Sequence, residues 1–133
     1  APKRLVPDTI KKALNNETLN YTLGDQIRDF VFIDDAVDAM IKTSISDLTI
    51  GETLNICSGT GVRIKDVVRL IVRNIKSKSI PKFGVLPYRE NEEMCIVGDP
   101  SKLSNMFGWW CTTSLEEGIK KSIESFNYPD SKN

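Results

Sequence analysis

The clearest periodic pattern in the chain predicts an amphipathic helix over residues 64–75. Apolar residues recur there at intervals of three and four, which places them on one side of a helix: Ile64, Val67, Val68, Ile71, Val72 and Ile75. The other side carries basic residues: Lys65, Arg69, Arg73 and Lys76. We interpret these basic residues as a solvated face, because a buried apolar stripe needs a polar side opposite it.

Capping residues predict further helices on both sides of this one. Helix starts are expected at Pro7, at Asp34 or Asp35, at Asp99 and at Ser114. The first of these helices should end near Leu14, and Gly108 should terminate the one that follows Asp99. The helix after Asp34 or Asp35 is expected to bury an apolar stripe made of Val37, Met40 and Ile41.

Short apolar runs between the helices predict strands. Phe30 to Ile33 is a continuous apolar run, which is typical of a buried strand. Further short strands are expected at residues 19–23, 52–57, 85–88 and 94–97. Because strands alternate with helices along the chain, the pattern predicts an α/β fold.

Composition narrows the classes of function. With 133 residues and 40% hydrophobic content, the chain fits one soluble globular unit. Lysine plus arginine and aspartate plus glutamate are balanced at 18 each, so we expect no nucleic-acid or membrane partner. There is no apolar run of membrane-spanning length and no signal peptide, so the expected location is the cytoplasm.

The residue types also exclude several kinds of catalysis. The chain has no histidine, so neither a Ser-His-Asp nor a Cys-His arrangement can form within it. Its three cysteines are far apart and include no CxxC pair, which argues against a zinc site or a disulfide scaffold. Gly59-Thr60-Gly61 begins a dinucleotide fingerprint, but Ile64 occupies the third glycine position. Tyr128 and Lys132 have Tyr-x-x-x-Lys spacing, which we interpret as coincidence because Pro129 disfavours a helix there.

Arginines in predicted loops are the best candidates for binding. Arg28 lies between a turn and a predicted strand, Arg89 lies between two predicted strands, and Arg4 lies near the first residue. A guanidinium presents a planar fork of donors, which suits the paired oxygens of a diphosphate. The alternative is that these arginines form surface ion pairs, and the residues alone leave both possibilities open. The acidic candidates are Asp34 and Asp35 for Arg28, and Glu92 and Glu93 for Arg89.

Several segments resemble, in order, the sequence blocks of nucleotide-sugar epimerases and dehydratases, which are extended short-chain dehydrogenases/reductases. Residues 24–35 resemble their GxQxRDxxxxxD block. The other similar segments are residues 2–7 (PxKLIP), 52–59 (ETYNIGSG), 89–93 (RPGxD), 99–103 (DxSKL), 107–109 (LGW) and 114–118 (SLEEG). The chain departs from these blocks at Thr22, where the family has a glycine, and at Glu90 and Asn91, where it has Pro-Gly.

The resemblance implies the distal part of a Rossmann-type enzyme, with strands of the cofactor-domain sheet and a small α/β substrate-binding cap. Residues 1–133 would form the C-terminal substrate-binding portion, with about 27–60 packing against a cofactor domain outside this chain. The family's glycine-rich turn and its catalytic Tyr-x-x-x-Lys pair are not found here. We therefore expect the missing N-terminal domain to bind NAD or NADP, and the chain alone to be inactive.

The resemblance also implies a reaction and a set of binding residues. The intact enzyme, expected as a homodimer, would oxidise C4 of a nucleotide-diphosphate sugar and then epimerise, dehydrate or reduce the product. The implied substrate-binding residues are Arg4, Leu5, Tyr21, Arg28 and Arg89, with no catalytic, cofactor or metal ligands in this chain. A second hypothesis is a noncatalytic nucleotide-binding or interaction module that kept the fold.

Overall fold

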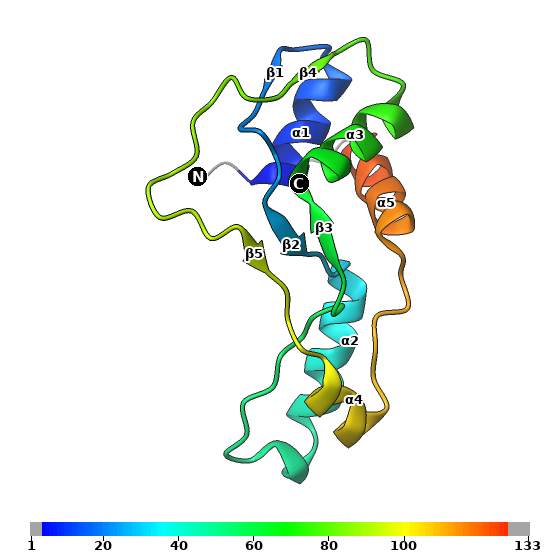
Figure 1. Ribbon diagram of the computed structural model, residues 1–133. Helices are drawn as coiled ribbons and strands as arrows, with labels where there is room; N and C mark the ends of the chain where they lie inside the picture. Colours follow the sequence, from blue (N-terminus) through cyan, green and yellow to red (C-terminus); the bar gives the residue numbers. More distant parts are fainter. Residues whose placement is uncertain (1–3, 128–133) are drawn as a thin grey trace, which may run out of the picture. The chain divides into compact units, whose positions relative to one another are not determined.

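The computed structural model describes residues 4–127 and alternates helices with short strands, which confirms the α/β class (Figure 1). The elements are α1 (Leu5–Leu14), β1 (Leu19–Asn20), β2 (Ile27–Asp29), α2 (Ile33–Ser44), η1 (Asp47–Thr49), β3 (Gly61–Arg63), α3 (Ile64–Ile75), β4 (Pro81–Lys82), β5 (Cys95–Ile96), α4 (Ser101–Phe107) and α5 (Leu115–Asn127). The chain divides into two compact units. Unit 1 comprises Ala1–Gln26, Arg63–Met94 and Ile119–Asn133, and unit 2 comprises Ile27–Val62 and Cys95–Gly118.

Unit 1 is built on the packing of α1 against α3, which lie side by side in Figure 1. The predicted stripe of α3 is buried at Val67, Val68 and Ile71, and α1 buries Ile10 and Ala13. Helix α3 ends where Lys76 adopts a left-handed conformation, with φ of 55°. Next to the helices, β1 and β4 pair in parallel, with Leu19 opposite Pro81. The periodicity therefore predicted both the bounds and the buried side of α3.

Unit 2 contains a sheet in which β2 lies between β3 and β5. Strands β2 and β5 are parallel, with Arg28 opposite Ile96. The sheet is tightly packed at Gly61, because a Cβ there would lie 2.5 Å from the Cγ2 of Ile27 and 2.8 Å from that of Val97. A cluster of Ala39, Leu103 and Trp109 joins α2 to the α4 region, and Figure 1 shows these two helices below the sheet.

The predicted strand at Phe30 to Ile33 is wrong. The strand is β2, which ends at Asp29, and Ile33 already begins α2. A strand forms where neighbouring strands supply a ladder of hydrogen bonds, and here β3 and β5 lie against β2 rather than against the apolar run. The predicted cap is also wrong, because Phe32 occupies the N-cap position without a side-chain hydrogen bond. Asp34 and Asp35 lie inside the first turn instead.

The predicted burial of the α2 stripe is wrong as well. Val37, Met40 and Ile41 are 42%, 56% and 57% exposed, and Ile33 and Ile45 continue the same exposed side of the helix. We call these five residues the α2 apolar face. The predicted strand at 52–57 also did not form, and within residues 4–127 this segment pairs with no other strand. The α2 apolar face is therefore exposed, whereas Leu54 and Ile56 pack against the cluster of Ala39, Leu103 and Trp109 although their segment forms no strand.

Other boundaries differ in smaller ways. Helix α1 begins at Leu5 rather than Pro7, and the strands predicted at 19–23 and 94–97 shorten to β1 and β5. No strand forms at 85–88, where the amide groups of Val85 and Leu86 donate to the carbonyl of Tyr21. The helix ends were predicted better. Ser114 accepts a hydrogen bond from the Glu117 amide at the start of α5, and Gly108 ends α4 with φ of 60°.

Candidate functional site

The structure divides the predicted substrate-binding residues between the two units. Arg4, Leu5, Tyr21 and Arg89 lie in unit 1, whereas Arg28 lies in unit 2. Within unit 1, Arg4 is exposed at the N-cap of α1, and half-buried Leu5 is the first residue of that helix. Pro2 and Lys3, which belong to the same sequence block, lie outside the described residues, as do Tyr128 and Lys132.

Tyr21 is held on several sides within unit 1. Its amide donates to the carbonyl of Lys82 at 2.9 Å, and its carbonyl accepts from Val85 and Leu86 at 3.1 Å each. The phenol oxygen lies 2.7 Å from the hydroxyl of buried Thr9. Burial raises the pKa of Tyr21, so its phenol remains protonated at neutral pH. The side chain can therefore act as a fixed aromatic surface with a neutral polar end.

The ring of Tyr21 stacks on Phe83, a residue that sequence reasoning did not single out. The two ring centroids are 5.8 Å apart, with an angle of 28° between the ring planes. The guanidinium of Arg69 lies over the Phe83 ring, 5.3 Å from its centroid. The basic side of α3 is thus more than a solvated face, because Arg69 covers an aromatic ring and Lys65 pairs with Asp25 at 2.5 Å.

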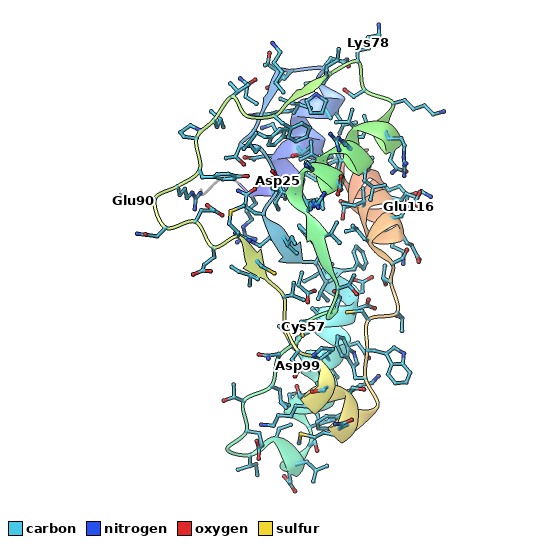
Figure 2. The ribbon with its side chains drawn as sticks, viewed as in Figure 1. Asp25, Cys57, Lys78, Glu90, Asp99 and Glu116 are labelled. Atoms are coloured by element: carbon cyan, nitrogen blue, oxygen red, sulfur yellow. The ribbon has the colours of Figure 1, made fainter. Side chains whose placement is uncertain are left out.

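Arg89 lies in the long loop between β4 and β5. The Glu92 amide donates to the Arg89 carbonyl at 3.2 Å, and Asn91 adopts φ of 59°, so residues 89–92 form a turn. Figure 2 shows Glu90 at the outer edge of this loop. Nearby, the phenol oxygen of Tyr88 accepts from the Asp25 amide at 3.4 Å. The Arg89 side chain is exposed, and its position in a loop agrees with the prediction, although the predicted strand before it did not form.

Arg28 lies on β2, the middle strand of the unit 2 sheet. Its Nη1 donates to the carbonyl of Ile27 at 2.8 Å, which holds the guanidinium close to its own strand. The predicted loop position of Arg28 is therefore wrong, because half-buried Arg28 lies within strand β2. A binding group on a strand is held more accurately than one on a loop.

Asp29, the neighbour of Arg28, fixes the end of β2. Its carboxylate accepts hydrogen bonds from the Ser58 amide at 2.9 Å, the Ser58 hydroxyl at 2.5 Å, the Gly59 amide at 2.9 Å and the Gly98 amide at 3.2 Å. Burial alone would raise the pKa of Asp29, but these hydrogen bonds outweigh it and hold the pKa below its usual value. Asp29 thus joins β2 to two segments that are distant in sequence.

Asp35 plays a similar part at the start of α2. It accepts from the Thr112 hydroxyl at 2.9 Å, the Thr113 amide at 2.9 Å and the Thr113 hydroxyl at 3.2 Å. Burial acts to raise its pKa, but the hydrogen bonds from Thr113 and Thr112 prevail and lower it. The predicted capping residue is therefore a link between α2 and the segment before α5.

A pocket of about 360 Å³ lies within unit 2, next to these two carboxylates. Its lining includes the ring of Phe30 and the hydroxyl-bearing residues Ser58, Thr60, Thr112 and Thr113. No group of three or more histidine, cysteine, aspartate or glutamate side chains suited to a metal ion occurs among residues 4–127. Over the same residues, no helix is long and apolar enough to cross a membrane.

The described residues do not form a dinucleotide-binding turn. Gly59 has φ of 74°, but the amide groups of Ser58 and Gly59 donate to Asp29 rather than remaining available for a phosphate. A Cβ at Gly59 would lie 3.0 Å from the ring of Pro100, so the glycine also serves close packing. Gly59-Thr60-Gly61 therefore acts as a turn between a loop and β3.

Comparisons with known proteins agree on one family. Residues 1–122 match the family model described as GDP-mannose 4,6 dehydratase. A CDP-abequose synthase from Salmonella muenchen is 31% identical over 121 residues, which cover 90% of this chain and 41% of that protein. The UDP-glucose 4-epimerase of Thermotoga maritima, solved with UDP-glucose, gives a TM-score of 0.84 at 24% identity, covering 96% of this chain and 40% of that one. The Bordetella bronchiseptica enzyme WbmF, solved with NAD+ and UDP, gives a TM-score of 0.75 at 28% identity. The match covers 93% of this chain and 36% of WbmF.

These matches confirm the predicted fold class. The TM-score of 0.84 shows that the chain shares the fold of part of the Thermotoga maritima epimerase. The chain spans about two fifths of its relatives' length, 41% of the CDP-abequose synthase and 40% of the Thermotoga maritima epimerase.

Proposed function

The chain belongs to the GDP-mannose 4,6 dehydratase family, and on that basis we propose that it is the substrate-binding portion of an NAD(P)-dependent nucleotide-sugar epimerase or dehydratase. The match over residues 1–122 carries this proposal, because it includes both the Tyr21 segment and the Arg28 strand. In the intact enzyme, the reaction would begin with oxidation at C4 of the sugar. The contribution of this chain is to bind and orient the nucleotide diphosphate.

The proposed binding residues are Arg28 and Arg89 for the diphosphate, Tyr21 for the base, and Arg4 and Leu5 at the edge of the nucleotide pocket. The geometry of each unit supports these roles. Arg28 lies on a strand whose end is fixed by Asp29, and Tyr21 donates a hydrogen bond to β4 and accepts two from the following loop. Such pre-organisation raises the rate of reaction by holding the substrate in a productive position.

We assign the cofactor to a domain outside this chain. The amide groups of Ser58 and Gly59 donate to Asp29, and that of Thr60 donates to the Ser58 hydroxyl, so this turn does not fit the phosphates of a dinucleotide. WbmF was solved with NAD+ and UDP together, and this supports an NAD-type cofactor for the family.

The cofactor domain would also cover apolar surface on unit 2. The α2 apolar face is exposed, and residues 52–57 lie without a strand partner among residues 4–127. We propose that residues of about 27–60 pack against this domain, which would bury the helix face and pair the extended segment. A homodimeric, cytoplasmic enzyme is the proposed intact form.

A binding screen of the chain tests this proposal. Titration with UDP, dTDP, CDP, GDP and NAD, followed by two-dimensional NMR, should show binding of at least one nucleoside diphosphate and none of NAD. The chain should also turn over no nucleotide sugar. NAD(P) copurifying in stoichiometric amount, or the absence of any nucleotide binding, would contradict the assignment.

A further inference from the structure

We propose that Phe83 is a positioning residue, which holds the ring of Tyr21 in place for stacking against the nucleotide base. The inference rests on the proposed function, in which Tyr21 contacts the base. It assigns a role to two residues that the sequence blocks did not identify, namely Phe83 and the residue that covers it, Arg69.

The backbone around Phe83 brackets the Tyr21 segment. Hydrogen bonds run from the Tyr21 amide to Lys82, from the Gly84 amide to Thr22, and from the Val85 and Leu86 amides back to Tyr21. Gly84 makes this turn possible with φ of 79°, and a Cβ there would lie 3.2 Å from a methyl group of Leu23. Phe83 is therefore fixed beside Tyr21 by the residues that precede and follow it.

Side-chain contacts then set the plane of the Tyr21 ring. Phe83 stacks against it at 5.8 Å, while the phenol oxygen is anchored 2.7 Å from the hydroxyl of Thr9. Arg69 reaches from α3 to cover Phe83 and is itself paired with Asp66 at 3.3 Å. Phe83 thus holds the face of the Tyr21 ring, and Thr9 holds its polar end.

A fixed aromatic ring is well suited to a nucleobase. Bases stack on aromatic side chains through their π-faces, and this attraction tolerates different bases. A ring that is already ordered before binding loses less conformational entropy when the base arrives. Removing Phe83 should therefore weaken recognition of the base while leaving recognition of the phosphates unchanged.

The test compares two ligands on the same 133-residue chain. UDP contains a base and a diphosphate, whereas inorganic pyrophosphate contains two linked phosphates and no base. NMR titration should show that Phe83→Ala weakens UDP binding about tenfold and changes pyrophosphate binding by less than about twofold. Phe83→Tyr should bind UDP like the wild type, since it keeps the stacking ring. Arg69→Ala should weaken UDP binding by about threefold.

Matched variants keep the test decisive. Lys78→Ala removes an exposed charge at the end of unit 1, where its side chain points away from the chain (Figure 2), and should change neither affinity. Phe83→Leu keeps apolar volume without an aromatic ring, so it replaces Phe83→Ala if the latter fails to fold. The role of Phe83 would be overturned if the folded Phe83 variant bound UDP and pyrophosphate with equally reduced affinity. It would also be overturned if that variant bound UDP as tightly as the wild type. A wild-type chain that binds neither ligand would instead overturn the proposed function and this inference with it.

Discussion

Helices α2 and α3 are both 12 residues long and both carry an apolar stripe that is visible in the sequence, yet the two stripes have opposite environments. In α3 the residues Val67, Val68 and Ile71 are 0% exposed, because α1 packs over them within unit 1. In α2 the equivalent side faces outward over most of its length. Periodicity thus predicts which side of a helix is apolar, whereas the partner that covers it depends on the rest of the protein.

The largest expected effect contrasts one isoleucine from each helix. Ile71→Ala should destabilise the chain by about 2–5 kcal/mol, because it leaves a cavity in a fully buried site. Ile41→Ala removes a side chain that is 57% exposed and should change the free energy of unfolding by less than about 0.5 kcal/mol. Urea denaturation of both variants measures this difference. Similar losses of stability would show that the α2 apolar face is already covered in solution.

The second prediction concerns association through the α2 apolar face. An exposed apolar surface of this kind promotes pairing with another chain, so the isolated chain should self-associate at high concentration. Replacing Ile41 with Lys should abolish most of that association, since a charge on the face resists burial. Sedimentation velocity of the two proteins, with Lys78→Ala as the control, tests the expectation. A wild-type chain that remains monomeric would count against a missing covering domain.

A third prediction separates the units by pH. Asp29 and Asp35, both in unit 2, have pKa values below the usual 3.8, so their ionised forms stabilise the fold above that pH. The stabilisation is lost as the pH falls through the lowered pKa values. The protection of the Ser58, Gly59, Gly98 and Thr113 amides against exchange, measured relative to the intrinsic rate at each pH, should therefore fall below about pH 3.8, before protection in α3 does.

Asp29→Asn provides the control for this pH effect. The amide would place an NH2 group against the donors of Gly59 or Gly98, so the variant should be less stable at pH 7. Its stability should also vary less between pH 5 and about pH 3 than that of the wild type. If Asp29→Asn lost as much stability at low pH as the wild type, the acid sensitivity would have to come from titratable groups other than Asp29.

Local signals in the sequence predicted the helices more reliably than the strands. The α3 stripe, the Ser114 cap and the Gly108 end depend on residues within a few positions of one another, and all three were confirmed. Strands β1, β4 and β5 have two residues each, and such short strands are set by their pairing partners. The apolar run at Phe30 to Ile33 was misread for this reason.

The candidate site shows the same limit of local information. Asp29 and Asp35 are hydrogen-bonded to residues that lie 29 and 77 positions away in the sequence, so neither link is visible as a motif. Phe83 was missed because a single aromatic residue after a short strand carries no periodic signal. The arginines were identified because guanidinium groups suit diphosphates, but their grouping came from the family resemblance.

The most direct test of the nucleotide-binding claim is calorimetric titration of UDP or dTDP into the intact enzyme and its arginine variants, with folding checked by circular dichroism. Arg28→Ala should weaken binding by about 10- to 100-fold, because a hydrogen bond to a charged phosphate contributes about 1.5–3 kcal/mol. Arg89→Ala should do nearly as much, and Arg73→Ala, on the exposed side of α3, should leave the affinity unchanged. If Arg28→Ala and Arg73→Ala both bound UDP or dTDP as tightly as the wild type, the assignment of Arg28 to the diphosphate would be contradicted.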